Sequence, residues 1–211
     1  KGIIYNKRSH IYKVNLNTKK FSKIVNGDKN NILSIQSLVE GKKNLIFSYD
    51  QYNSKGTMLE EKIGSLKGTE VNEIYSKGSM GNLFYYENEL HAVGMRKRFD
   101  WPTNTTILKV SDTGKISYKY PSFDRNIVKA AVNNNTLYFM YEDSGKTLLR
   151  DGTNNVDLVE ADVTIKDFAF NGDKTYVISN SFSSPDEIYE IDDSQLLKVS
   201  KANESFNKKV K

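Results

Sequence analysis

Short apolar runs separated by turn residues dominate the chain, and the spacing of apolar residues typical of helices is nearly absent. The runs are rich in Val, Ile, Tyr, Phe and Thr, and they are bounded by Gly, Asn, Asp and Ser. Clear examples cover residues 44–49, 136–141 and 175–179. Because strands joined by turns produce this pattern, it predicts an all-β protein.

The segments between these runs carry residues that tolerate a positive φ angle. Asn-Gly-Asp occurs at 26–28 and 171–173, Asp-Thr-Gly-Lys at 112–115 and Asp-Gly-Thr-Asn at 151–154. Tight two-residue hairpins require such residues, so the sequence predicts strands that follow one another as antiparallel neighbours.

The predicted strands recur in groups of four, with a period of roughly 40 to 45 residues, which is the spacing of β-propeller blades. A partial group precedes them at 2–5, 9–14 and 20–25. The first strands are predicted at 32–35, 81–85, 128–132 and 165–170, the second near 45, 90, 137 and 175, the third at 57–60, 106–110, 147–150 and 187–191, and the fourth at 71–75, 115–118, 156–159 and 195–199.

This recurrence predicts a β-propeller with about four complete four-stranded blades and a partial fifth. Two architectures follow: a closed five-bladed ring, or part of a seven- or eight-bladed ring. We expect residues 1–211 to form a single propeller domain or the C-terminal portion of one. A jelly roll or sandwich is the competing fold, but it would not need so regular a repeat.

Charge and composition exclude several classes of function. The net charge is +5, but the lysines are interleaved with Asp and Glu, so we expect no nucleic-acid partner. There is no cysteine, which excludes disulfides and thiolate zinc sites. No apolar run is long enough to span a membrane, so we expect no membrane partner.

Catalytic chemistry has no recognisable pattern in this chain. The elbow G-x-S-x-G is absent, and its nearest relative, Gly-Ser-Met-Gly at 78–81, is interpreted as a turn between blades. His10 and His91 lie within strand patterns and are interpreted as structural. The acidic pairs at 186–187 and 192–193 are interpreted as turn residues. We therefore predict no catalytic residue, no metal and no cofactor.

One segment, residues 95–102, is unusual because it combines several cations with the only tryptophan. Arg and Trp are favoured at binding hot spots, since they combine area with directed polar groups. Arg96, Arg98, Phe99 and Trp101 are the candidates for contact with a substrate or a partner. The alternative interpretation is an ordinary loop whose Trp covers the edge of a blade.

The last third of the chain resembles a known family. The motif Ser-x-x-x-Pro-x-Glu-Ile-Tyr ends at Tyr189, Leu-Leu-Lys-Val-Ser follows at 196–200, and Ala-Asn-Glu follows at 202–204. This succession resembles the last propeller blade of the prolyl oligopeptidase family, in its acylaminoacyl-peptidase-like branch. Residues 137–145 and 9–14 resemble earlier blades, whereas the Ser-Pro-Asp-Gly turns common in such blades are missing.

The resemblance implies a function without catalytic groups. In that family the propeller caps an α/β-hydrolase domain that holds a Ser, Asp and His triad, and it restricts access to short peptides. The resemblance implies a hydrolase domain joined in cis, and we expect that domain to lie outside residues 1–211. It also implies peptide substrates and a cytoplasmic location, and it leaves an extracellular location open. Because the first residue is Lys1 and not Met, we expect a processed product or a fragment. The alternative is a free-standing propeller that binds a protein or glycan ligand.

Overall fold

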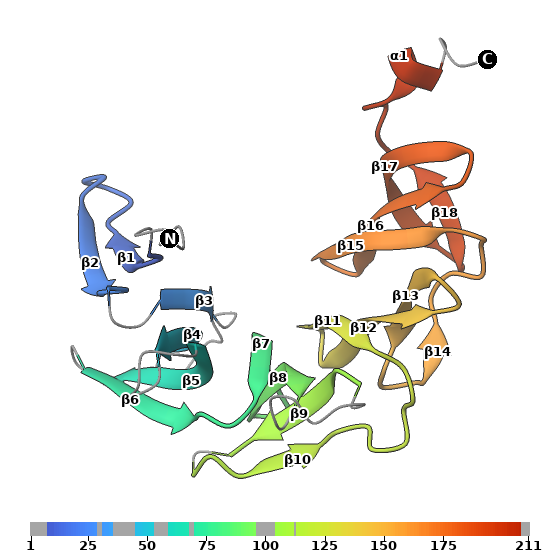
Figure 1. Cartoon of the computed structure of the whole chain (residues 1–211). Coiled ribbons are helices and arrows are strands. Elements are labelled where there is room, and N and C mark those ends of the chain that lie inside the picture. Colours follow the sequence, from blue (N-terminus) through green and yellow to red (C-terminus); the bar gives the residue numbers. More distant parts are fainter. Residues whose placement is uncertain are drawn as a thin grey trace, which may run out of the picture. The chain divides into compact units, whose positions relative to one another are not determined.

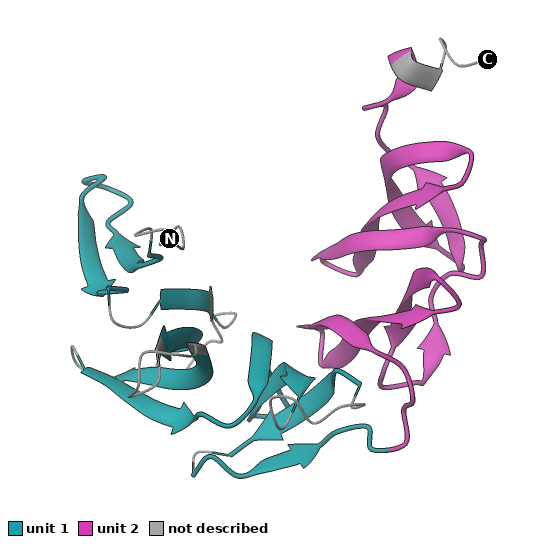
Figure 2. Ribbon diagram, viewed as in Figure 1, with its two compact units in different colours: residues 1–121 teal, residues 122–211 magenta. Residues whose placement is uncertain are grey.

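A computed structural model describes residues 8–28, 31–35, 45–52, 59–67, 70–95, 104–111 and 113–207. Within these ranges the protein consists of antiparallel strands and one helical turn, α1 (Glu204–Asn207) (Figure 1). The chain divides into two compact units, residues 1–121 and 122–211, which are described separately (Figure 2).

Among its described residues, the first unit contains a two-stranded sheet and two four-stranded sheets, each built from consecutive strands. The hairpin of β1 (Ile11–Val14) and β2 (Phe21–Val25) is the two-stranded sheet. The next sheet comprises β3 (Asn31–Ile35), β4 (Ile46–Tyr52), β5 (Leu59–Lys67) and β6 (Glu70–Tyr75), and the one after it comprises β7 (Ser79–Tyr86), β8 (Glu89–Met95), β9 (Thr106–Val110) and β10 (Ile116–Tyr118).

The second unit repeats the same arrangement twice. One sheet comprises β11 (Ile127–Asn133), β12 (Thr136–Asp143), β13 (Lys146–Asp151) and β14 (Val156–Asp157), and the other comprises β15 (Thr164–Asn171), β16 (Lys174–Ser181), β17 (Ser184–Asp192) and β18 (Gln195–Lys198). Every sheet is a meander of sequential strands, which is the topology of a propeller blade and not of a Greek-key sandwich.

Each predicted strand that the structure describes overlaps an observed strand, including those at 9–14 and 20–25. Two bounds differ clearly, because β14 ends at Asp157 instead of 159, and β5 continues to Lys67 instead of ending at 60. The repeat is less regular than expected, because the first strands begin at Asn31, Ser79, Ile127 and Thr164. The predicted strand at 2–5 lies outside the described residues. The interpretation of 78–81 as a turn is wrong for its last three residues, since Ser79 opens β7 and pairs with Met95.

Two-residue turns join the first and second strands of three sheets. Glu87 and Asn88 both have positive φ angles, as do Asn134 and Asn135, whereas the third turn uses Gly172 (φ 62°). These left-handed residues match the twist of the strands that they connect. Corresponding residues in these three sheets therefore lie the same number of residues away from the turn.

A backbone hydrogen bond that recurs in three sheets shows which of their residues are equivalent. The backbone carbonyls of Ile107, Leu149 and Ile188, each in a third strand, accept the N–H of the residue that directly follows the fourth strand. Those three donors are Lys119, Leu158 and Val199, at 2.9 Å in each case. Ile107, Leu149 and Ile188 are therefore equivalent positions of successive sheets.

Apolar clusters lie between successive sheets within each unit. In the first unit, Ile63 of one sheet packs with Met80 and Leu108 of the next. In the second unit, Met140 and Leu149 pack with Ile165, Phe168 and Val177. The sheets are thus held face to face by burial of side chains from both, since a single sheet could not bury its faces alone.

Candidate functional site

The four residues predicted to contact a substrate or partner, Arg96, Arg98, Phe99 and Trp101, lie outside the described residues. The described strands on either side of them are β8, which ends at Met95, and β9, which begins at Thr106. The segment therefore joins the second and third strands of one sheet, as the sequence predicted. The contact role of the four residues stays a prediction.

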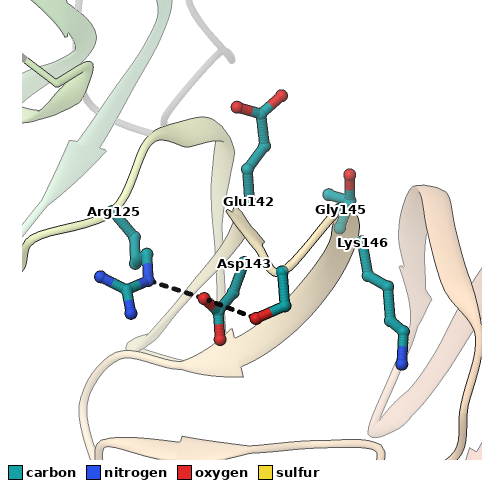
Figure 3. A pocket seen from close by; sticks show the side chains of 7 residues that line it. Arg125, Glu142, Asp143, Gly145 and Lys146 are labelled. Carbon is teal, nitrogen blue, oxygen red and sulfur yellow. Dashed lines mark hydrogen bonds and ion pairs between the residues drawn. The ribbon is translucent and has the colours of Figure 1, made fainter.

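A pocket of about 390 Å³ surrounds the tight turn between β12 and β13 (Figure 3). The segment that precedes β11 forms its other side. Its lining is polar and carries both signs of charge: Arg125, Glu142, Asp143, Ser144, Gly145, Lys146 and Thr147.

Most charged side chains that line this pocket are in ion pairs. Arg125 Nε donates to Asp143 Oδ1 at 2.7 Å, and Arg125 Nη1 donates to the carbonyl of Asp124 at 2.6 Å. The hydrogen bond from Arg125 lowers the pKa of Asp143, and the same bond raises the pKa of Arg125. Lys146 forms an ion pair with Asp162. The pocket thus offers donors and acceptors to a polar ligand, but no histidine that could activate Ser144.

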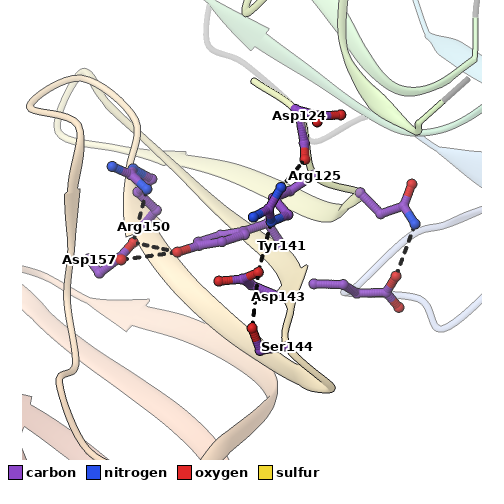
Figure 4. Close-up of polar contacts among 9 residues, drawn as sticks. Asp124, Arg125, Tyr141, Asp143, Ser144, Arg150 and Asp157 are labelled. Atoms are coloured by element: carbon purple, nitrogen blue, oxygen red, sulfur yellow. Dashed lines mark hydrogen bonds and ion pairs between the residues drawn. The ribbon is translucent and has the colours of Figure 1, made fainter. Parts of the chain in front are cut away.

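A network beside the pocket secures the segment that leads into β11 (Figure 4). The Tyr141 hydroxyl contacts both carboxylate oxygens of Asp157 at 3.0 Å, and burial together with Asp157 raises the pKa of Tyr141. The Arg150 guanidinium lies 5.8 Å from the ring centroids of both Phe123 and Tyr141. Phe123 also packs edge-on against Phe139. These contacts hold Phe123 against the sheet, so we interpret the network as one that stabilises the fold.

Glu187 is the most deeply buried carboxylate of the described chain, with 2% of its surface exposed. It accepts a hydrogen bond from the Ser200 hydroxyl, and it accepts the backbone N–H groups of Ala202 at 3.0 Å and Asn203 at 2.9 Å. Lys198 Nζ lies 3.1 Å from its Oε1. These donors, led by Ser200, lower the pKa of Glu187 to about 2 against the opposing effect of burial.

The interpretation of 186–187 as turn residues is therefore wrong, because Asp186 and Glu187 both lie inside β17. The alternation of inward and outward residues along a strand could have found it, because Glu187, Tyr189 and Ile191 share one face. The interpretation of 192–193 as turn residues is confirmed for Asp193, which has a φ angle of 45°, whereas Asp192 is the last residue of β17.

Both histidines have structural partners. His91 is buried, stacks on Phe84 with ring centroids 5.6 Å apart, and donates from Nδ1 to the carbonyl of Glu89 at 3.0 Å. Burial lowers the pKa of His91. His10 accepts the N–H of Gly27 at 2.8 Å through its Nδ1. The prediction of structural roles for His10 and His91 agrees with these contacts.

Metal-binding and membrane-spanning features were also sought. Within the described ranges, no group of three or more His, Cys, Asp or Glu residues is arranged to hold a metal ion. No helix in the same part of the chain is long and apolar enough to cross a membrane.

Comparison with solved structures decides the fold. The chain is similar to the acylaminoacyl peptidase of Pyrococcus horikoshii, with a TM-score of 0.67 and 14% identity, over 94% of this chain and 31% of that one. It is also similar to the β-propeller domain of the trilobed protease of Pyrococcus furiosus, with a TM-score of 0.61 and 12% identity, over 92% of this chain and 76% of that one. The chain has a β-propeller fold.

A third similar structure is a puromycin-hydrolyzing peptidase of Mycobacterium tuberculosis, with a TM-score of 0.61 and 14% identity, over 86% of this chain and 30% of that one. This chain thus spans about a third of the length of each of these two peptidases. No model of a known protein family matches the sequence, and no curated protein matches it either. The resemblance to the propellers of the prolyl oligopeptidase family is confirmed at the level of the fold.

Proposed function

We propose that this propeller is the non-catalytic domain of a serine peptidase of the prolyl oligopeptidase or acylaminoacyl-peptidase type. It docks to an α/β-hydrolase domain in cis and admits short peptides to that domain. The observation that carries the proposal is the similarity of almost the whole chain to a peptidase and to a protease propeller domain, at 94% and 92% coverage.

The described chemistry supports a role in binding and gating. The pocket beside the β12–β13 turn offers polar and charged side chains to a ligand, and His91 is enclosed by aromatic rings. A triad supplied by another domain would complete the enzyme. The segment with Arg96, Arg98, Phe99 and Trp101 is then a surface for peptide carboxylates or for the hydrolase domain, and the resemblance favours the cytoplasm.

Gating is tested on the product of the complete reading frame. Its hydrolysis of a short peptide and of a peptide of about 30 residues with the same cleavage site is compared with that of a variant from which the entire propeller is removed. We expect the complete protein to discriminate strongly against the long peptide, and the shortened one to lose this discrimination. Equal discrimination by both proteins would contradict gating.

The contact role of residues 96–101 is tested by the double variant Arg96→Ala/Arg98→Ala. A carboxylate contact predicts a raised KM for peptides with little change in Tm, because the side chains would meet the substrate and not the core. Lys97→Ala is the matched control in the same segment. An effect of Lys97→Ala as large as that of the double variant would count against a specific contact by the two arginines.

A further inference from the structure

The third strand of the last sheet departs from its counterparts at one position. Because Ile107, Leu149 and Ile188 are equivalent, Glu187 corresponds to Thr106 and Leu148. A carboxylate therefore stands where the two preceding sheets have a hydroxyl and an aliphatic side chain. A buried carboxylate costs free energy unless donors surround it, so its presence calls for a specific purpose.

The chain beyond the fourth strand follows one course in three sheets and then diverges. Lys119, Leu158 and Val199 bind the third strand in the same way. After Leu158, Val159 enters the apolar cluster between the sheets, with 5% of its surface exposed. At the corresponding place after Val199, Ser200 accepts the N–H of Ile188 at 2.8 Å and donates to Glu187.

Further hydrogen bonds attach the chain after Ser200 to β17, up to the helical turn α1. The N–H groups of Ala202 and Asn203 both point to the Glu187 carboxylate, and Asn203 Nδ2 donates to the carbonyl of Asp186 at 2.6 Å. Two side chains of the segment and two of its backbone N–H groups are therefore tied to two adjacent residues of β17. Hydrogen bonds to an ionised acceptor are about twice as strong as neutral ones.

We propose that Glu187 is a positioning residue that fixes the course of residues 200–204 against the last sheet, so that the chain leaves the propeller in one set direction. The role of that direction, namely to orient a following hydrolase domain, rests on the proposed function. The attachment itself is a property of this chain and can be tested without a second domain.

Hydrogen exchange of the full chain tests the attachment. In Glu187→Gln the side chain has one acceptor oxygen in place of two, and its amide group meets N–H donors. We expect the amides of Ala202 and Asn203 to exchange about tenfold faster or more, while those of Val177 and Tyr189 keep their rates. Faster exchange throughout the sheet would contradict a positioning role, and unchanged exchange at Ala202 and Asn203 would contradict the attachment.

Two further variants keep the test decisive. Glu190→Gln is the matched control, because Glu190 lies on the same strand but pairs with Lys174 on the exposed face, and we expect it to leave both amides unchanged. Ser200→Ala removes one donor to Glu187 and the acceptor of the Ile188 N–H, but it retains the carboxylate, so it serves if Glu187→Gln fails to fold. We expect it to accelerate trypsin cleavage after Lys201. Cleavage at the wild-type rate in Ser200→Ala would overturn the proposal.

Discussion

Leu149 of β13 and Ile188 of β17 occupy the same position in consecutive sheets, yet Leu149 is 1% exposed and Ile188 is 43% exposed. Leu149 lies in the cluster between its own sheet and the following one, together with Phe168. In the second unit no described sheet follows the sheet of Ile188. Comparing variants at these two positions therefore shows how much packing between sheets contributes to the free energy of unfolding.

Alanine substitutions at these two positions form a matched experiment. Leu149→Ala leaves a cavity between two sheets and should lower the free energy of unfolding by about 2–5 kcal/mol. Ile188→Ala should cost less than about 1 kcal/mol, because much of its side chain already contacts water. Urea denaturation of both variants checks the difference. Equal losses would mean that the face of Ile188 is covered in solution.

Stability should fall in mild acid because of His91. Burial lowers its pKa in the folded protein, whereas the unfolded chain has the ordinary value of about 6.5. Between these two values only the unfolded state binds the proton, so the stabilisation is complete above about pH 6.5 and is lost as the pH falls, by at most about 1.4 kcal/mol per pH unit. Urea denaturation at pH 7.5 and 5.5 measures this.

His91→Phe is the variant that isolates this effect, since a phenyl ring keeps the stacking on Phe84 and cannot titrate. We expect its stability to change less than that of the wild type over the same interval. A wild-type pH dependence that persists undiminished in His91→Phe would show that groups other than His91 cause it.

Arg150 should tolerate lysine poorly. Its guanidinium lies over Phe123 and Tyr141 while it donates to the side chain and the carbonyl of Asn155, and an ammonium group cannot do both. We expect Arg150→Lys to lower the free energy of unfolding by about 1–2 kcal/mol.

Arg125→Lys provides the comparison for Arg150. The Arg125 side chain is 49% exposed and pairs with Asp143 at the surface, so the cost should stay below about 1 kcal/mol. Thermal unfolding of both variants tests the order. A larger loss for Arg125→Lys would show that the pocket, and not the aromatic network, holds the segment before β11.

The ion pair of Lys129 on β11 with Asp167 on β15 links two sheets but should contribute little. Both side chains are substantially exposed, so solvent screens their attraction. We expect Lys129→Met to change the free energy of unfolding by less than about 1 kcal/mol, and the difference from wild type to shrink further in 0.5 M salt. A large, salt-insensitive loss would instead indicate that the contact of Lys129 with the Phe168 ring dominates.

Strand positions could be predicted from the sequence because one signal determines them. A short run rich in Thr, Ile, Leu and Val, followed by Ser and Asp, predicted the third strand of one sheet with the same bounds as β9. The turn at Glu87 was not predicted, since glutamate rarely adopts a positive φ angle and carries no turn signal. The Asn-Gly-Asp sequence at 171–173, by contrast, predicted the hairpin turn at Gly172.

The role of Glu187 could not be read from composition, because its donors come from residues 200–203, beyond the next strand. Only the paired register of β17 and β18 brings Ser200 to the carboxylate. In the same way, the pocket beside Ser144 depends on Arg125, which comes from the segment before β11. Local patterns predict elements, whereas contacts between distant residues need the fold.

The central claim, that this propeller serves a peptidase, is tested most directly by reading the coding frame beyond the codon for Lys211. The account predicts an α/β-hydrolase region with G-x-S-x-G followed by an Asp and a His. A stop codon at that place would contradict it, and would favour a free-standing propeller that binds a protein or glycan ligand.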